Sequence, residues 1–265
     1  MDKSQNYIEI NRALWNERTR HHVSSAFYDM EGFMAGNNSL KEIELALLGD
    51  LEGKSVLHLQ CHFGQDSLSL SRMGAKVTGV DLSEAAIEKA RDINKDLGLD
   101  AAFIISDLYE TPAKLDKQFD IVFTSYGTIG WLPDMKKWAE VIAHFLKPGG
   151  KLVFAEFHPA VWMFDNDFTY VQYPYFNKEV IIEQEEGTYT DANAKINLES
   201  VGWNHDLGEV IQSLINAGLT IQHFGEYDYS PYDCLKNMIE ISPGKYVIKG
   251  MEGKLPLVYS LVAVK

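Results

Sequence analysis

Short apolar runs alternate with helical patterns from residue 53 onward. This alternation is typical of strand-helix-strand units, in which parallel strands form a sheet and helices cover its faces. The apolar runs at 54–59, 76–80, 102–105, 119–124 and 151–157 are the predicted strands. A chain of 265 residues is long enough to bury a sizeable core around such a sheet. We therefore predict an α/β fold with a mostly parallel sheet and helices on both faces.

Helix signals fall between these strands. Ser83 is a typical N-cap residue and Gly98 a typical stop, while Gly74 suits the end of a helix over 66–73. The apolar spacing of 135–146 predicts another amphipathic helix. Ahead of the first strand, 5–20 and 39–48 also have helical patterns, and Ser39 with Glu42 forms a capping box that would open the second.

The alternation stops after the fifth strand. Residues 158–203 are rich in aromatic side chains and contain an acidic, hairpin-like patch at Glu183, Glu185 and Glu186. We expect this segment to be an insertion that sets specificity. A capping box of Asp206 and Glu209 then predicts a helix that ends before Gly218, followed by strands at 219–224 and 256–264 and a short helix near 232–239.

These patterns predict a single domain over 1–265 with four parts. A helical cover or lid occupies 1–38, the sheet core that would bind a ligand 39–157, the aromatic-rich insertion 158–203, and the C-terminal part of the core sheet 204–265.

Charge and cysteine content exclude several classes of function. The chain has 24 Lys and Arg against 38 Asp and Glu, a formal net charge of −14, so binding of nucleic acid through bulk charge is not expected. The N-terminal sequence lacks a signal peptide, and no window has the apolar length of a membrane helix, which predicts a cytoplasmic protein. Cys61 and Cys234 are too far apart for a metal knuckle, and the adjacent His21 and His22 do not have zinc-ligand spacing, so we expect no metal.

Polar residues follow each of the first five predicted strands. Open parallel sheets bind ligands at the carboxyl ends of their strands, and nucleotides bind at the turn after the first. Asp81 lies 17 residues after Gly64, close to the spacing at which an acidic residue binds a ribose. The other clusters are 60–66 after strand one, Ser106-Asp107-Leu108 after strand three, Ser125-Tyr126 after strand four and Glu156-Phe157-His158-Pro159 at the end of strand five.

In this order of motifs, the sequence resembles the class I S-adenosylmethionine-dependent methyltransferases, closely over 53–158 and in layout over 206–265. The acidic residues after strands two and three fall on Asp81 and Asp107, and the Asp at the start of strand four on Asp120. The Leu-Lys-Pro-Gly-Gly turn at 146–150 is among the family's most recognisable features. The resemblance implies a Rossmann-like seven-stranded sheet of order 3-2-1-4-5-7-6 with its last strand antiparallel.

The first family motif departs from its usual form. An acidic residue followed by Gly-x-Gly-x-Gly becomes His-Leu-Gln-Cys-His-Phe-Gly at 58–64, where only Gly64 matches. The variant Leu-Gln-Cys-His-Phe-Gly resembles a substitution in one branch of the family. Gln60 and His62 replace glycines, so either the turn keeps negative φ at these residues or the cofactor lies slightly further from the backbone.

The resemblance implies S-adenosylmethionine as cofactor, S-adenosylhomocysteine as product, and specific contacts for each part of the cofactor. Gln60, His62 and Gly64 would line its methionine end, Asp81 would bind the ribose, and Asp107 and Leu108 the adenine. Ser125 and Tyr126 would line the passage to the acceptor. Gln65, Leu82 and Ser106 complete the predicted cofactor contacts.

The implied reaction is methyl transfer to a small-molecule acceptor by in-line displacement. His158 and Tyr126 are the candidate catalytic residues, His158 as a general base at the rim of the sheet. Candidate acceptor contacts are Trp131, His158, Trp203 and Tyr28. The aromatic residues of 158–203 suit a pocket for a flat or apolar acceptor, but a homodimer surface would have the same composition.

Two other functions stay open from the sequence. A nicotinamide-dependent oxidoreductase has a related fold, although its Gly-x-Gly-x-x-Gly motif is absent from 60–66. A non-catalytic cofactor-binding protein would retain the fold with a degraded first motif.

Overall fold

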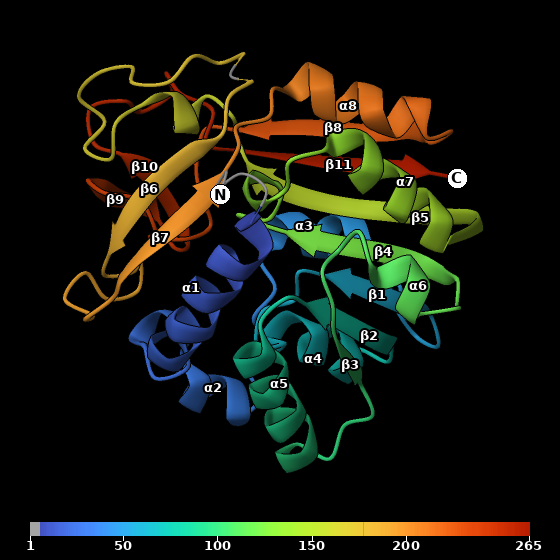
Figure 1. The fold of residues 1–265 in the computed structure, drawn as a ribbon. Helices are drawn as coiled ribbons and strands as arrows, with labels where there is room; N and C mark the ends of the chain where they lie inside the picture. Colours follow the sequence, from blue (N-terminus) through green and yellow to red (C-terminus); the bar gives the residue numbers. More distant parts are fainter. Residues whose placement is uncertain (1–5, 177) are drawn as a thin grey trace.

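The computed structural model describes residues 6–176 and 178–265. Its centre is a seven-stranded sheet of order β3-β2-β1-β4-β5-β11-β8 (Figure 1). Strands β1 to β5 are parallel, and β11 is antiparallel to both of its neighbours, β5 and β8. The predicted topology with a reversed last strand is therefore confirmed. The strands are β1 Ser55–Leu59, β2 Lys76–Asp81, β3 Ala102–Ile105, β4 Phe119–Ser125, β5 Leu146–Phe157, β8 Thr220–Tyr227 and β11 Val258–Val264.

Helices cover both faces of this sheet because the strands present apolar side chains on both sides. Helices α7 and α8 pack on one face, where Trp138, Phe154 and Leu214 belong to one buried cluster. Buried clusters that contain Leu48, Leu70 and Ile87 fill the space under α3, α4 and α5. The helices are α3 Glu42–Leu48, α4 Gln65–Arg72, α5 Glu84–Asp96, α6 Thr111–Lys114, α7 Met135–Phe145 and α8 Leu207–Asn216.

Two of the predicted N-caps are confirmed. The hydroxyl of Ser83 accepts a hydrogen bond from the main-chain N–H of Ala86 at 3.1 Å, at the start of α5. The carboxylate of Asp206 accepts one from the N–H of Glu209 at 2.9 Å, at the start of α8. Each bond satisfies a main-chain donor that the first turn of a helix leaves unpaired.

Segments outside the sheet gather at the carboxyl ends of its parallel strands. Helix α1 (Tyr7–His22) packs against α5 and against β7 of a hairpin formed by β6 (Ile181–Glu186) and β7 (Asn197–Gly202) (Figure 1). The side chain of Asn11 bonds to both main-chain groups of Val201, at 2.8 and 2.9 Å. The short helices η2 (Ala26–Tyr28) and α2 (Met30–Met34) follow α1.

Two predictions of secondary structure are wrong. The helix expected near 232–239 is absent: β9 (Met238–Ser242) pairs with β10 (Lys245–Ile248) in a hairpin, whose turn places Gly244 at φ 70°. Helix α3 begins at Glu42, not at Ser39, and the main-chain N–H of its N-cap residue Lys41 donates to Oε1 of Glu44 at 2.7 Å. Ser39 lies two residues before this N-cap, and its hydroxyl bonds to that of Ser69 at 2.8 Å. No helix in the described ranges is long and apolar enough to cross a bilayer.

Candidate active site

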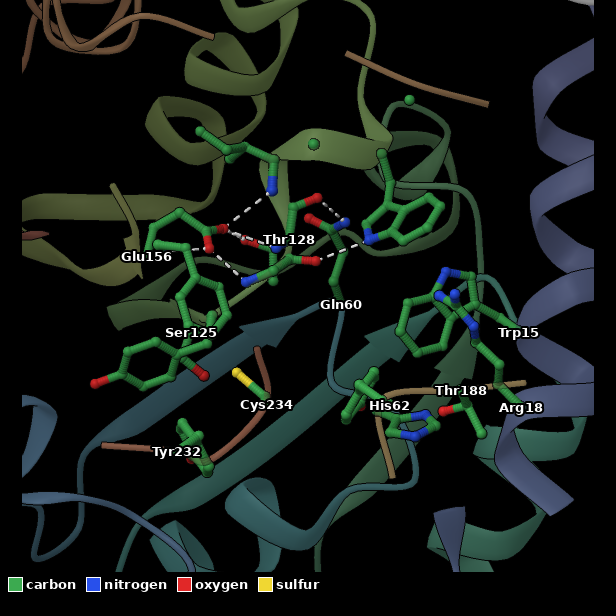
Figure 2. A pocket seen from close by; sticks show the side chains of 18 of the residues that line it. Trp15, Arg18, Gln60, His62, Ser125, Thr128, Glu156, Thr188, Tyr232 and Cys234 are labelled. Carbon is green, nitrogen blue, oxygen red and sulfur yellow. Dashed lines mark hydrogen bonds between the residues drawn. The ribbon is translucent and has the colours of Figure 1, made fainter. Parts of the chain in front are cut away.

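A cavity of about 1190 Å³ lies where the parallel strands end, beneath α1 and the β6–β7 hairpin. The structure brings every predicted cofactor residue to its lining, although these residues come from four separate turns of the chain. They are Gln60, His62, Gly64, Gln65, Asp81, Leu82, Ser106, Asp107, Leu108, Ser125 and Tyr126. Figure 2 shows Gln60, His62 and Ser125 among the side chains of this pocket.

The turn after β1 has a left-handed backbone at three alternate residues. The φ angles are 56° at Gln60, 50° at His62 and 77° at Gly64. Glycine adopts this conformation freely, whereas other residues do so at a cost of roughly 1 kcal/mol or more. Of the two alternatives given by the sequence, negative φ at Gln60 and His62 is therefore wrong: the variant turn keeps the backbone conformation that glycines favour.

Contacts of the substituted side chains hold this turn in place. The amide of Gln60 donates a hydrogen bond to the main-chain carbonyl of Thr128 at 2.8 Å. The ring of His62 meets that of His22 from α1, with Nε2 and Nδ1 2.9 Å apart. At Gly64 a side chain is excluded, since a Cβ atom would lie 2.7 Å from the ring of Phe103.

Asp81 connects the end of β2 to the same turn. Its carboxylate accepts hydrogen bonds from the main-chain N–H groups of His62 at 2.8 Å and Ser83 at 2.9 Å. Burial raises the pKa of Asp81 to about 6 against the opposing effect of these bonds. Each carboxylate oxygen has a second lone pair, so Asp81 can still accept bonds from a ligand in the cavity.

Asp107 follows β3, the edge strand next to β2, and also lines the cavity. Its Oδ1 accepts hydrogen bonds from the main-chain N–H groups of Tyr109 at 2.9 Å and Glu110 at 3.3 Å. Burial raises the pKa of Asp107 above its usual value. Leu108 beside it is buried and offers an apolar surface to the cavity.

Comparison with known proteins agrees with this geometry. Residues 56–150 match the family model described as a methyltransferase domain. This part of the chain is a methyltransferase domain. It spans β1 to the start of β5 and so contains the turn of Gln60 and His62 together with Asp81 and Asp107.

The methyltransferase domain also has similar curated and solved relatives. Ubiquinone biosynthesis O-methyltransferase of Klebsiella pneumoniae is 29% identical over 137 residues, which is 50% of this chain and 56% of that protein. The match thus spans little more than half the length of this relative.

Solved structures share the fold. A Listeria monocytogenes protein assigned to the S-adenosylmethionine-dependent methyltransferases aligns with TM-score 0.61 and 20% identity, over 84% of this chain and 95% of its own. A Mesorhizobium loti S-adenosylmethionine-dependent methyltransferase aligns with TM-score 0.59 and 22% identity, over 88% of this chain and 100% of its own.

The loop after β4 of the methyltransferase domain is held by Glu156, to which the sequence analysis assigned no role. This buried carboxylate accepts bonds from the main-chain N–H groups of Gly127, Thr128 at 2.7 Å, Ile129 at 3.2 Å and Phe157 at 2.7 Å (Figure 2). Its position at the end of β5 was the available signal, because strand ends form ligand sites in such sheets.

Tyr126 is paired with a second residue that sequence analysis missed. Its hydroxyl donates a hydrogen bond to Oε2 of Glu44 at 2.8 Å. Glu44 is fully buried, and burial, with a smaller effect of Asp66, raises its pKa to about 7. Glu44 lies in the apolar sequence of α3. Nothing in that sequence distinguishes a carboxylate that bonds to a distant tyrosine from one that only caps the helix.

Three of the four predicted acceptor residues line the cavity. The indole of Trp131 donates to the carbonyl of Gly127 at 2.8 Å, and Trp203 packs edge to face on Tyr7 at 5.2 Å. The hydroxyl of Tyr28 lies 2.5 Å from that of Tyr189.

His158 does not reach the lining of the cavity. Its Nε2 lies 3.0 Å from a carboxylate oxygen of Glu226, and its Nδ1 accepts from the N–H of Ala160 at 3.1 Å. Both ring nitrogens are thus engaged within the protein, as in a structural histidine. His58, at the place of the family's acidic residue, lies 2.8 Å from the hydroxyl of Ser67, and burial lowers its pKa to about 3.

Proposed function

We propose that the chain transfers a methyl group from S-adenosylmethionine to a small-molecule acceptor. The observation that carries this proposal is the convergence of Asp81, Asp107 and the left-handed turn of Gln60 on one cavity. Carboxylates at the ends of the second and third strands suit a ribose and an adenine amino group.

The cavity also offers an acceptor for the cationic amino-acid end of this cofactor. Oε1 of Gln60 is buried and has no hydrogen-bond partner in the described part of the chain. A buried amide oxygen without a donor is costly, and an ammonium group would satisfy it. Gln60 would then replace the acidic residue whose place His58 occupies. The residues present therefore fit the cofactor.

The cofactor supplies a methyl group on a sulfonium, which already has a good leaving group. The protein residues must align the nucleophile with this methyl and exclude water. Helix α1 and the β6–β7 hairpin cover the cavity and serve the second purpose.

Tyr126 and Glu44 would remove the proton that the acceptor loses on methylation. Tyr126 lines the cavity, and its phenolic oxygen would accept a hydrogen bond from an acceptor hydroxyl or amine while its own proton faces Glu44. Glu44, with a pKa of about 7, can take up a proton near neutral pH. We assign the proton role to this pair in place of His158.

The same proposal includes the roles of the segments, the class of acceptor, the location of the protein and its assembly. The described chain would act as one unit, with α1 as the cover and 158–203 as the acceptor element. The named activity of the Klebsiella relative supports a small-molecule acceptor. The free thiols Cys61 and Cys234 support a cytoplasmic location. Exposed Tyr170, Val171 and Phe176 would supply apolar contacts in a homodimer.

Calorimetry with S-adenosylmethionine, S-adenosylhomocysteine and NADH tests the proposed function. We expect both sulfur nucleotides to bind and NADH not to bind. Failure of both sulfur nucleotides to bind at millimolar concentration would overturn the proposal, and binding of NADH alone would favour an oxidoreductase.

A further inference from the structure

Arg18 of α1 is a buried cation in the wall of the cavity. The residue is 6% exposed, and its NH2 group lies 2.9 Å from a carboxylate oxygen of Glu185 on β6. Its guanidinium carbon lies 5.2 Å from the centre of the Trp15 ring and 5.5 Å from that of Trp131. The side chain is therefore fixed by one ion pair and two aromatic rings, and Figure 2 shows it beside Trp15.

Three buried polar atoms of residues in the cavity wall have no hydrogen-bond partner among the described residues: Nε of Arg18, Oγ1 of Thr190 and Nδ1 of His62. All three residues line the cavity. We call this group the Arg18 corner. Most buried polar groups in proteins are paired, so three unpaired ones in a single corner indicate a missing ligand group.

A chain of contacts holds these residues together. The ring of His62 meets His22, whose Nε2 lies 2.6 Å from the hydroxyl of Thr188. The same hydroxyl accepts from the N–H of Thr190 at 3.4 Å. His22 is also one helical turn after Arg18 on α1. The Arg18 corner therefore joins the β1 turn, the N-terminal helix and the insertion.

We propose that the Arg18 corner binds a neutral oxygen of the methyl acceptor, such as a carbonyl oxygen, between the guanidinium Nε and the Thr190 hydroxyl. This inference rests on the proposed function. Both groups can donate hydrogen bonds, and Nδ1 of His62 can donate or accept according to its tautomer.

The charges around the corner select a neutral group over an anion. Glu185 already balances the charge of Arg18. In the described lining of the cavity, Asp and Glu side chains outnumber the basic ones, which are Arg18, Lys41 and Lys236. A carboxylate ligand would add a negative charge to this surface, whereas a carbonyl oxygen needs only the donors that the corner provides.

The surrounding rings indicate a flat acceptor. Trp15 and Trp131 meet edge to face, with ring centres 5.3 Å apart and planes at 84°. Such rings contribute apolar contact area for a planar group next to the oxygen. The elements involved are the turn after β1 at His62, α1, η3 (Ile129–Trp131) and the insertion. Of these groups, only His62 is also among those assigned above to the cofactor.

A matched pair of probes tests the Arg18 corner in the presence of saturating S-adenosylhomocysteine. The probes are 4-hydroxyacetophenone, which has a carbonyl oxygen, and 4-ethylphenol, which lacks it. We expect the wild-type protein to bind the ketone about 5-fold or more tighter, as one or two hydrogen bonds would give. This preference should disappear in Arg18→Met and in Thr190→Val. An absent preference, or no binding of either probe at millimolar concentration, would overturn the inference.

Control variants and nucleotide binding separate an acceptor site from a cofactor site and from poor folding. Thr190→Val keeps the shape of the side chain, so it tests the corner even if Arg18→Met folds poorly, and Arg20→Met is a control on an exposed arginine of the same helix. S-adenosylhomocysteine should bind Arg18→Met as it binds the wild type. Weaker binding of this nucleotide, with unchanged binding of 5′-methylthioadenosine, would assign the corner to the cofactor carboxylate and contradict the inference. Failure of the wild type to bind S-adenosylhomocysteine would instead refute the proposed function.

Discussion

The carboxylate of Asp81 accepts a hydrogen bond from the main-chain N–H of His62 at 2.8 Å. This bond fixes the left-handed turn after β1 against the end of β2. The group proposed to bind the ribose is therefore also the group that shapes the neighbouring turn, and the ligand contacts and the strained backbone depend on each other.

Replacement of Asp81 tests its proposed role directly. We expect Asp81→Ala to weaken binding of S-adenosylhomocysteine by about 1–3 kcal/mol, because the ribose hydroxyls lose an ionised acceptor. Calorimetry measures the effect. Asp92→Ala, on the exposed surface of α5, is the control and should bind as the wild type does. Unchanged affinity in Asp81→Ala would refute the assignment.

Gln60 tests the backbone strain of the turn. Gln60→Gly and Gln60→Ala both lose the bond to Thr128, so the difference between them reports the backbone alone. At φ 56°, glycine should be the more stable variant by about 1 kcal/mol in urea unfolding. At Glu88, an exposed position in helix α5, the order should reverse, so that Glu88→Ala is more stable to urea than Glu88→Gly. The reason is that glycine disfavours the helical conformation. The same order at both positions would argue against a left-handed Gln60.

Glu44 predicts a pH dependence of stability. Its pKa is raised from 4.5 to about 7, so the folded protein keeps a proton that the unfolded chain releases. The contribution of Glu44 to stability is complete below pH about 4.5 and is lost as the pH rises through about 7. Relative to wild type, Glu44→Gln should therefore gain up to about 3 kcal/mol between these pH values.

Urea unfolding of both proteins at a series of pH values measures this gain. Glu88→Gln, at an exposed site, should show none. The difference in unfolding free energy between Glu44→Gln and wild type should change across this pH range. A constant difference would contradict the raised pKa of Glu44.

Glu156 is predicted to be essential for the loop after β4. In Glu156→Gln an amide N–H₂ group would replace one carboxylate oxygen and face N–H donors that this oxygen accepts. These donors are Gly127 and Phe157 at Oε1, or Thr128 and Ile129 at Oε2. We expect a loss of about 1–3 kcal/mol in unfolding free energy, measured by urea titration. A variant as stable as the wild type would show that this network is not required.

The positions of the parallel strands, and the gathering of the predicted cofactor residues in one cavity, followed from the sequence because they depend on local signals. Asp81 and Asp107 each follow an apolar run at the end of a strand, and parallel strands bring such ends to one edge. Ser83 was likewise identified as a typical N-cap residue ahead of a helical pattern, and Asp206 from Glu209 three residues later.

Residues that depend on distant partners could not be found in this way. Glu44 meets Tyr126 across 82 positions of the chain, and His22 meets Thr188 across 166. His158 was chosen for its place after β5, but strand β8, on the far side of β11, supplies Glu226 as its partner. Such pairings are set by tertiary packing, which a sequence pattern of short range does not encode.

A crystal structure of the protein with S-adenosylhomocysteine tests the central claim most directly. We predict electron density in the cavity with the ribose hydroxyls within hydrogen-bond distance of Asp81 and the amino group near Oε1 of Gln60. A nucleotide bound elsewhere, or a cavity without density at saturating nucleotide, would contradict the account.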